Sequence, residues 1–477
     1  MGFYSLVGFL RPAIYIFLLP LYISYFSAAE YGIYNLMIDV AAIAMILASL
    51  KINTAMMTHY YDYMGDEHTQ FRYLQNLYTG CLLIGSIFLL SMYFMGPWIF
   101  EHVFKDDAIT FFPYGMTVMA YAMLFEATQV YLTYLKNKKN IWRFTFIMLF
   151  HVISIVVLQF IFIIVLERGV KGALESVLIG NILVTMLVMI MQPRLLTFKL
   201  DFKMIISSLT FSIMLVPYLV IYWFLTRGGR IFLESYTDLD TVAVFGLLMV
   251  LSGVIILAVE AVVNGVRPFL FEQFAQGAHA NDKTISILSK MVVNIPLLFV
   301  PIIILVSCFI HLISSEAIYA TVPLYMPAAC LLWFAIVISR LFYQQLLFAK
   351  KSHTVTILSF VTVSILIAGF MYLIPRYEIW GVIVATIIAN SVMALLFYLF
   401  AQKAWYVHYS YISIILSPAL VFASIFILQY LSNINGWSIQ TFGWLQFVVA
   451  LFIILVMNVG NVREYMKVFK NGDVSKA

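Results

Sequence analysis

The strongest constraint on this chain is a succession of apolar runs, each about 20 residues long, separated by short polar connections. A run of that length crosses the hydrocarbon core of a bilayer as an α-helix, whereas a barrel strand needs only about 10 residues. Hydrophobic residues make up 64% of the 477 and charged residues 10%, which excludes a water-soluble fold. The sequence therefore predicts an all-α integral membrane protein.

We expect about 14 transmembrane helices, because that many runs are long enough to cross a bilayer. They lie near residues 3–26, 32–52, 74–95, 111–135, 141–166, 172–192, 208–235, 241–262, 289–310, 321–349, 353–375, 380–401, 411–430 and 441–460. The first run has no small-residue cleavage site after it, so it is interpreted as a retained span instead of a signal peptide.

Lys and Arg residues gather in every second connection, as membrane orientation requires. This asymmetry predicts a multi-pass protein of a bacterial plasma membrane with both termini in the cytoplasm. The formal net charge of +5 is explained by the same asymmetry, so no nucleic-acid partner is expected.

An internal repeat with a step of about 210 residues indicates two halves related by symmetry. The matched positions are Pro113 with Pro323, Lys138-Lys139 with Lys350-Lys351, and Asn181 with Asn390. We therefore expect two pseudo-symmetric six-helix bundles and two additional C-terminal helices. The predicted domains are 1–200, 201–405 and 406–477, the last including a cytoplasmic tail.

The repeat also extends the seventh span to about residue 235, through the segment TRGGRIFL. Arg227 and Arg230 would then lie within the membrane profile. Gly228 and Gly229 between them would permit a broken helix there. The alternative is an ordinary outer loop.

Ionisable side chains inside spans are costly and usually face a cavity or a partner. Arg11, Arg227 and Arg230 are candidates for binding an anionic substrate headgroup. For Arg11, a structural pair with Glu126 or a position at the lipid boundary is the alternative. Asp39 and Glu126 are candidates for coupling to a proton or cation, with a fixed salt bridge as the alternative.

Three more charged residues lie at the inner ends of spans and could form a gate of ion pairs, or be ordinary solvated ends: Lys51, Glu260 and Arg340. Lys51 and Glu260 occupy nearly equivalent places in the repeat with opposite charge. Glu126 and Arg340 also correspond, to within about one helical turn. We expect a cavity between the two halves to be lined by charge from both sides.

Signals of catalysis are missing from the sequence. It contains no G-x-x-x-x-G-K-[ST] phosphate loop and no His/Asp, Ser/His or paired-Cys constellation. The cysteines, Cys81, Cys308 and Cys330, lie inside apolar runs without a C-x-x-C pair, so no disulfide framework or metal site is predicted. We expect a protein that is not an enzyme and needs no cofactor.

One segment carries a resemblance to a known family. The sequence PLYISYFSAAEYGIYNLM from Pro20 to Met37 contains the acidic-Tyr-Gly element Glu30-Tyr31-Gly32. It resembles the opening of polysaccharide transporters, the Wzx-like oligosaccharide-lipid flippases, whose superfamily includes multidrug and toxin extruders and lipid II flippases. The resemblance implies alternating access and a cationic cavity for pyrophosphate and sugars. These flippases often carry an Asp-Arg pair in span seven, where this chain has Gly229-Arg230.

The expected function is that of a flippase for a lipid-linked oligosaccharide, a polyprenyl-pyrophosphate-linked repeat unit, in surface polysaccharide biosynthesis such as that of lipopolysaccharide O-antigen. Its expected partners are this substrate and membrane lipids, with a polysaccharide polymerase and glycosyltransferases as further candidates. Cation-coupled multidrug efflux is one alternative. A membrane-embedded polysaccharide polymerase or acyltransferase is another, although the outer connections are short for such an enzyme.

Overall fold

The computed structural model describes residues 14, 16–63, 65–276, 282–314, 316–407, 409 and 411–470. Every regular element in these ranges is a helix. By internal contacts the chain divides into two compact units, Met1–Ala243 and Val244–Ala477. They are called unit 1 and unit 2 below.

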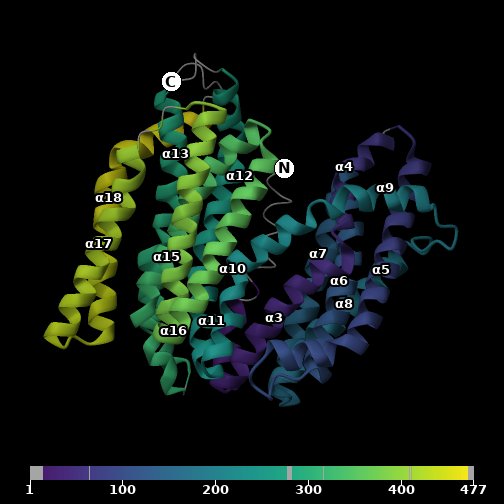
Figure 1. Ribbon diagram of the computed structural model, residues 1–477, viewed down its shortest axis with the longest axis horizontal. Helices are drawn as coiled ribbons and strands as arrows, with labels where there is room; N and C mark the ends of the chain where they lie inside the picture. The colour runs from purple at the N-terminus through teal and green to yellow at the C-terminus, as the bar shows by residue number, and fades with distance from the viewer. Residues whose placement is uncertain are drawn as a thin grey trace. The chain divides into compact units, whose positions relative to one another are not determined.

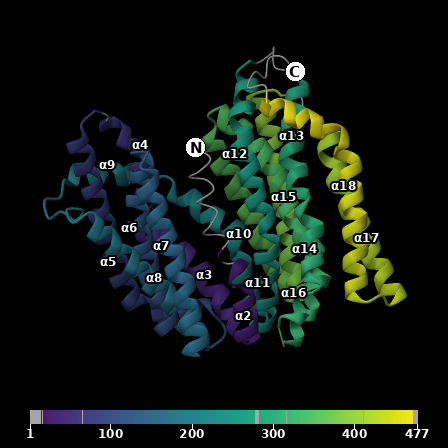
Figure 2. The same cartoon turned by 180° about the vertical axis from the view of Figure 1, so that it is seen from behind.

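Unit 1 is a helical bundle, coloured purple to teal in Figure 1. Its helices are α2 (Leu19–Tyr25), α3 (Ala28–Ser49), α4 (Ile52–His59), α5 (Glu67–Val103), α6 (Met116–Asn137), α7 (Ile141–Phe160), α8 (Gly169–Met191), α9 (Phe202–Ile213) and α10 (Val216–Tyr236), with the short turns η1 (Tyr60–Tyr63), η2 (Phe111–Gly115) and η3 (Ile161–Val165). Helices α5, α6, α7 and α8 lie side by side in both Figure 1 and Figure 2. Buried aromatic and aliphatic side chains, among them Tyr73, Tyr131 and Phe144, fill the space between them.

Helix α3 begins at a capping box, which explains the sharp entry into this segment. Ser27 Oγ accepts a hydrogen bond from the backbone N–H of Glu30 at 3.2 Å, and Glu30 Oε2 accepts one from the backbone N–H of Ser27 at 3.0 Å. These two bonds satisfy donors that a helix start leaves unpaired. Gly32, in the same first turns, lies so close to Leu239 that a Cβ atom there would be 2.4 Å from its carbonyl oxygen. The Glu30-Tyr31-Gly32 element therefore has a local structural role.

Unit 2 holds the remaining helices, apart from α11 (Leu239–Ser252), which begins in unit 1. They are α12 (Val254–Ala275), α13 (Asp282–Leu297), α14 (Phe299–Ser307), α15 (Val322–Phe348), α16 (Ser352–Ala404), α17 (Tyr411–Asn435) and α18 (Ile439–Lys470), with the turns η5 (Ile310–Leu312) and η6 (Ala317–Thr321). Helices α17 and α18 pack on each other and against α13, α14 and α15. Buried amides fix α18 in place: Gln446 Nε2 donates to the Pro301 carbonyl at 3.1 Å, and Asn294 Nδ2 donates to Asn458 Oδ1 at 2.9 Å.

Helix α16 consists of two antiparallel helices joined at Glu378, where the backbone leaves the helical region with φ of 47°. A Cβ added to Gly369 would touch Ala385, and one added to Gly381 would touch Leu373, so the two arms run alongside each other. These arms correspond to the predicted runs 353–375 and 380–401.

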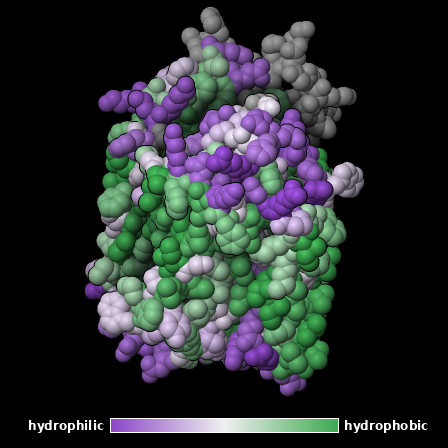
Figure 3. All heavy atoms as spheres, turned by 90° about the vertical axis from the view of Figure 1, so that its right-hand side faces the viewer, coloured by the Kyte–Doolittle hydropathy of each residue, from purple (hydrophilic) through white to green (hydrophobic). Residues whose placement is uncertain are grey.

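Among the described residues, ten helical segments are long and apolar enough to cross a membrane, and the bent pair α9 and α10 provides an eleventh. The segment His353–Ala404 counts once in this total although it contains both arms of α16. The part of the predicted first run before residue 14 lies outside the described residues, and its later part contains α2. The surface in Figure 3 carries a mostly apolar band between two ends where hydrophilic residues gather, as a membrane-spanning surface does. The all-helical membrane fold is confirmed, and the count of about 14 stays a prediction.

The two halves of the repeat share local backbone geometry at corresponding positions. Lys139 and Lys350, one residue from each of the matched Lys-Lys pairs just after α6 and α15, both have φ of 57°. The residue after each donates its N–H five residues back: Asn140 to Leu135 at 2.9 Å, and Lys351 to Leu346 at 3.0 Å. Glu167 and Glu378 also correspond, with φ of 49° and 47° at the turns that follow α7 and the first arm of α16. The sequence repeat is therefore also a repeat of helix endings.

The boundary between the compact units, at Ala243 and Val244, lies later than the predicted boundary at 200 and 201. Helix α9 packs on α4 and α5, and α10 packs on α3, so the two helices belong to unit 1 by contact. The division into 1–200, 201–405 and 406–477 follows the repeat instead, and it stays a prediction.

Candidate functional site

A cluster of three charged residues joins α3 to α10 inside unit 1, and we call Asp39, Arg227 and Arg230 the Asp39 cluster. Asp39 is completely buried. Arg230 Nη1 donates to Asp39 Oδ1 at 2.8 Å and to Oδ2 at 2.6 Å, while Arg227 Nη1 donates to Oδ1 at 2.7 Å. Charge-assisted hydrogen bonds of this length are among the strong ones in proteins. Both carboxylate oxygens therefore bond to guanidinium groups.

The geometry of α10 explains how both arginines reach one carboxylate. Residues three apart in a helix lie on the same face, so Arg227 and Arg230 point in the same direction. The expected break at Gly228 and Gly229 is wrong, because α10 continues through both glycines as far as Tyr236. The chain bends by 43° earlier, between α9 and α10, where Pro217 occupies the first turn of the new helix. The arginines thus lie on a regular helix and not in a loop.

A third bond fixes α10 against α3. The indole Nε1 of Trp223 donates to the backbone carbonyl of Asp39 at 2.9 Å, and Trp223 is 6% exposed. Trp223 lies one turn before Arg227, on the same side of the helix. Trp223 is a site residue that was not predicted from the sequence, although its spacing of four from Arg227 is a usable signal.

The cluster carries an excess of one positive charge, since two guanidinium groups face one carboxylate. Its members differ in access: the side chain of Arg230 is 10% exposed, whereas that of Arg227 is 40% exposed. The Nε atom of Arg230 has no hydrogen-bond partner in the described part of the chain. Asp39 therefore holds the arginines in place, and Arg227 presents part of its guanidinium to the surroundings.

Asp39 also supplies the acidic partner that the sequence around Arg230 lacks. The flippases that the sequence resembles often have an Asp beside this arginine in the seventh span, where this chain has Gly229. In the structure the carboxylate comes from α3, in the second span, and contacts Arg230 across the helix interface. The ion pair is present, but its acidic member is on a different helix.

One turn beyond Arg230, Glu234 connects the same helix to the loop between α5 and α6. Its side chain is buried, and Oε1 accepts hydrogen bonds from the backbone N–H groups of Lys105 at 2.9 Å and Asp106 at 2.8 Å. Buried carboxylates require such compensation. Residues 104–110 are therefore fastened to the helix that carries both arginines.

Glu126, on α6, pairs with Lys51 at the end of α3. Lys51 Nζ lies 2.7 Å from Glu126 Oε1, and Ser49 Oγ donates to Oε2 at 3.2 Å. Leu50 and Lys51 both adopt left-handed backbone conformations, with φ of 45° and 56°, at the junction between α3 and α4. The side chain of Glu126 is 1% exposed. This carboxylate therefore has its cation within unit 1.

Glu260, on α12, pairs with Arg340, on α15, inside unit 2. Arg340 Nη2 lies 3.4 Å from Glu260 Oε1, and the guanidinium also lies 5.8 Å from the centre of the Tyr343 ring. The side chain of Glu260 is 40% exposed and that of Arg340 16%. The structure therefore brings the candidate gating and coupling residues together as ion pairs within single units. Their roles stay predictions, and Arg11 lies outside the described residues.

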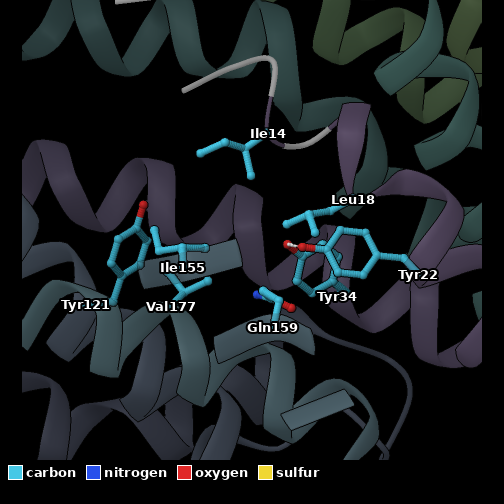
Figure 4. A pocket seen from close by; sticks show the side chains of 8 residues that line it. All are labelled: Ile14, Leu18, Tyr22, Tyr34, Tyr121, Ile155, Gln159 and Val177. Atoms are coloured by element: carbon cyan, nitrogen blue, oxygen red, sulfur yellow. Dashed lines mark hydrogen bonds between the residues drawn. The ribbon is translucent and has the colours of Figure 1, made fainter. Parts of the chain in front are cut away.

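A small, mainly apolar cavity lies among α2, α3, α6, α7 and α8 (Figure 4). Tyr34 Oη donates to Tyr22 Oη at 3.0 Å, and Gln159 Nε2 donates to the Ala173 carbonyl at 2.9 Å. The volume of about 20 Å³ accommodates a water molecule but no sugar or lipid group. Gln159 was another residue that the sequence analysis missed, although a glutamine inside an apolar run is itself a signal. The cavity is too small to be the substrate site.

No group of three or more His, Cys, Asp or Glu side chains suited to a metal ion occurs in the described ranges. The cysteines Cys81, Cys308 and Cys330 are buried and unpaired with one another.

The sequence matches no family model and no curated protein. Its structure is similar to solved transporters. The lipid II flippase MurJ in an inward closed conformation matches 98% of this chain and 100% of its own length, with a TM-score of 0.65 and 15% identity. An inward-facing multidrug resistance MATE family transporter of the MOP superfamily matches 82% of this chain and 97% of its own, with a TM-score of 0.56 and 13% identity. A MATE structure in the straight conformation matches 83% and 93%, with a TM-score of 0.55 and 15% identity. The chain has the fold of these membrane transporters.

Proposed function

We propose that this chain is a flippase that moves a lipid-linked oligosaccharide, a polyprenyl-pyrophosphate-linked repeat unit, across a bacterial plasma membrane. Transport proceeds by alternating access and serves surface polysaccharide biosynthesis. Glycosyltransferases would supply the substrate and a polymerase would consume it. The chain itself acts as a transporter and not as an enzyme, in keeping with the transporters whose fold it has.

The observation that carries this proposal is the charge of the Asp39 cluster. A pyrophosphate linkage bears negative charge, and arginine is well suited to it because the planar guanidinium donates two parallel hydrogen bonds to phosphate oxygens. Two guanidinium groups surround the one carboxylate of Asp39, so the three side chains together carry a net positive charge. Arg227, the more exposed member, is then the residue that contacts the substrate, and Arg230 positions Asp39.

Cation-coupled drug efflux is the competing function, because the MATE transporter structures have a fold similar to that of this chain. An efflux site for cationic drugs needs a carboxylate that is available to the drug. Asp39 has both oxygens bonded to arginine, and Glu126 is bonded to Lys51 and Ser49. The MurJ similarity also extends over α17 and α18, since it covers 98% of the chain, whereas the MATE similarities cover 82% and 83%. Both observations favour the lipid-linked substrate.

The proposal is tested in proteoliposomes that contain a polyprenyl-pyrophosphate-linked oligosaccharide. Substrate that reaches the outer leaflet is measured by its accessibility to an added glycosidase. Arg227→Ala should reduce flipping at least about tenfold, because a charge-assisted contact to phosphate is lost, while the thermal unfolding temperature changes little. Arg168→Ala is the matched control, since Arg168 pairs with Glu175 in the same unit and its side chain is also 40% exposed.

Two outcomes would reject the proposal. One is normal flipping by both Arg227→Ala and Arg230→Ala. The other is ethidium transport driven by a sodium or proton gradient without any movement of the glycolipid, which would assign the chain to drug efflux.

A further inference from the structure

A second pocket, larger and polar, lies at one end of unit 1, away from the Asp39 cluster. Its volume is about 250 Å³, by the measure that gives about 20 Å³ for the small cavity. It is lined by the start of α5, the last turns of α6, the start of α7 and the end of α8, through Glu67, Phe71, Tyr131, Tyr134, Leu135, Lys138, Asn140, Arg143 and Gln192. None of these residues takes part in the proposed transport site.

The charges around this pocket have a positive excess. Lys138 and Arg143 are cationic, and Glu67 is the one acidic residue among those that line it. Lys138 Nζ lies 3.3 Å from Glu67 Oε1, a pair whose side chains are 40% and 82% exposed, so it is solvated and easily rearranged. Burial alone would lower the pKa of Lys138, but Tyr134 and Glu67 offset this effect and the pKa is raised. Lys138 therefore stays cationic at neutral pH, and the guanidinium group of Arg143 is also positively charged.

The polar walls suit an anion with several acceptor oxygens. Tyr131 and Tyr134 are 1% and 7% exposed as whole residues, yet both line the pocket. Asn140 and Gln192 add amide groups. A phosphate group accepts several hydrogen bonds at once, and arginine, lysine and tyrosine are its usual donors.

The neighbouring surface of α7 indicates how such an anion would arrive. Trp142, next to Arg143, is 83% exposed, and Phe146, one turn on, is 53% exposed. Exposed aromatic residues beside basic residues are typical of the boundary between the hydrocarbon core and the lipid headgroups. Lys136 and Lys139 lie within the same stretch. A headgroup could therefore enter the pocket while its acyl chains remain against the aromatic surface.

We propose that this pocket binds the phosphate of an anionic membrane phospholipid. Free phosphate offers the same chemistry, but the exposed aromatic residues beside Arg143 favour the lipid. On the predicted orientation the pocket faces the cytoplasmic leaflet, where anionic lipids attract basic segments. The lipid is a bound partner of unit 1 and not the transported substrate, so the proposal does not depend on the proposed function.

The test is a titration of the purified full chain in detergent with phosphatidylglycerol, followed by native mass spectrometry. Arg143→Gln and Lys138→Gln should each weaken binding of the tightest lipid by about tenfold, since each removes a charge-assisted contact. Arg194→Gln and Lys199→Gln are the matched controls, because they remove one arginine and one lysine charge from the exposed segment after α8, outside the pocket lining. The controls should bind within about twofold of the unaltered chain.

Further arms separate the sources of the phosphate. Phosphatidylcholine should bind the unaltered chain at least about tenfold more weakly than phosphatidylglycerol, and inorganic phosphate or glycerol 3-phosphate should not displace the lipid at millimolar concentration. Equal binding by Arg143→Gln and the unaltered chain would overturn the proposal, provided that both unfold at the same temperature without lipid. Tight binding of inorganic phosphate alone would overturn the lipid assignment.

Discussion

The Lys51–Glu126 pair of unit 1 and the Glu260–Arg340 pair of unit 2 occupy corresponding places in the repeat, but their charges are exchanged. In unit 1 the cation follows α3 and the anion is on α6, whereas in unit 2 the anion is on α12 and the cation is on α15. Each pair is neutral as a whole. Each unit therefore has an ion pair of zero net charge at this place in the repeat, and the positive residue can come from either of the two segments.

The pairs also differ in burial. The side chain of Glu126 is 1% exposed and lies 2.7 Å from its cation, whereas that of Glu260 is 40% exposed and lies 3.4 Å from its cation. A carboxylate without solvent depends on its partner, because a buried charge that loses its partner is strongly destabilising. A half-exposed carboxylate is stabilised by water as well. Unit 1 should therefore respond much more strongly than unit 2 when its pair is broken.

The largest effect is expected for Lys51→Gln. This change leaves Glu126 buried with Ser49 as a hydrogen-bond donor and no cation, so the free energy of unfolding should fall by about 3 to 5 kcal/mol. Thermal unfolding in detergent, followed by tryptophan fluorescence, measures the loss. The double variant Lys51→Gln with Glu126→Gln should regain most of it. An unchanged unfolding temperature in Lys51→Gln would show that the ion pair with Glu126 does not stabilise unit 1.

Exchanging the charges of unit 1, by Lys51→Glu together with Glu126→Lys, gives it the polarity of unit 2. The double variant should be more stable than the sum of the two single variants predicts, by about 1 to 3 kcal/mol, because contacting residues couple by that amount. A double-mutant cycle of unfolding temperatures determines the coupling. If the stability losses of the two single variants simply add in the double variant, the exchanged pair does not form in unit 1, and the two pairs are not equivalent.

Ser49→Ala tests the hydroxyl contact that supports the unit 1 pair. The single hydroxyl proton is shared between the Met45 carbonyl at 2.8 Å and Glu126 Oε2 at 3.2 Å, and the hydroxyl oxygen accepts from the backbone N–H of Lys51 at 3.1 Å. Losing these bonds should cost about 1 to 2 kcal/mol, less than losing the cation. Ser424→Ala, on α17, is the control. The hydroxyl of Ser424 donates to the Val421 carbonyl of its own helix, so this variant measures the loss of a bond within one helix. Equal losses would mean that the contact with Glu126 contributes nothing.

The smallest effect is expected for Glu260→Gln in unit 2. Because the pair is partly exposed, the change should cost less than about 1 kcal/mol in the same unfolding assay. A loss as large as that of Lys51→Gln would contradict the argument that burial, and not position in the repeat, sets the strength of each pair.

Hydropathy and the repeat predicted the class of fold because bilayer thickness and backbone hydrogen bonding act on every span in the same way. They also identified three of the buried charged residues, Asp39, Glu126 and Arg230, but not Glu234. Partners could not be predicted, since Asp39 and Arg230 are separated by more than half of unit 1 and no spacing rule connects them. The alternatives considered for Glu126 included Arg11, and the structure pairs it with Lys51.

The break in the seventh span shows a second limit of the sequence. Two consecutive glycines allow a helix to break but do not force it to do so. Helix α10, which packs on α3, continues through Gly228 and Gly229. Pro217 marks the actual bend because it cannot donate a hydrogen bond to the preceding turn. Pro217, which removes a helix hydrogen bond, therefore predicts the position of the bend better than the two glycines, which only make the backbone more flexible.

The bonds from Lys105 and Asp106 to Glu234 have a practical consequence. A nanobody or small cyclic peptide that gripped residues 104–110 would pull on the helix that carries Arg227 and Arg230 without entering the lipid. Asp107 and Ala108 are exposed within this loop and would be the natural epitope. Under the proposed function and the predicted orientation, the loop is an outer attachment point by which a reagent that stays outside the cell would arrest transport.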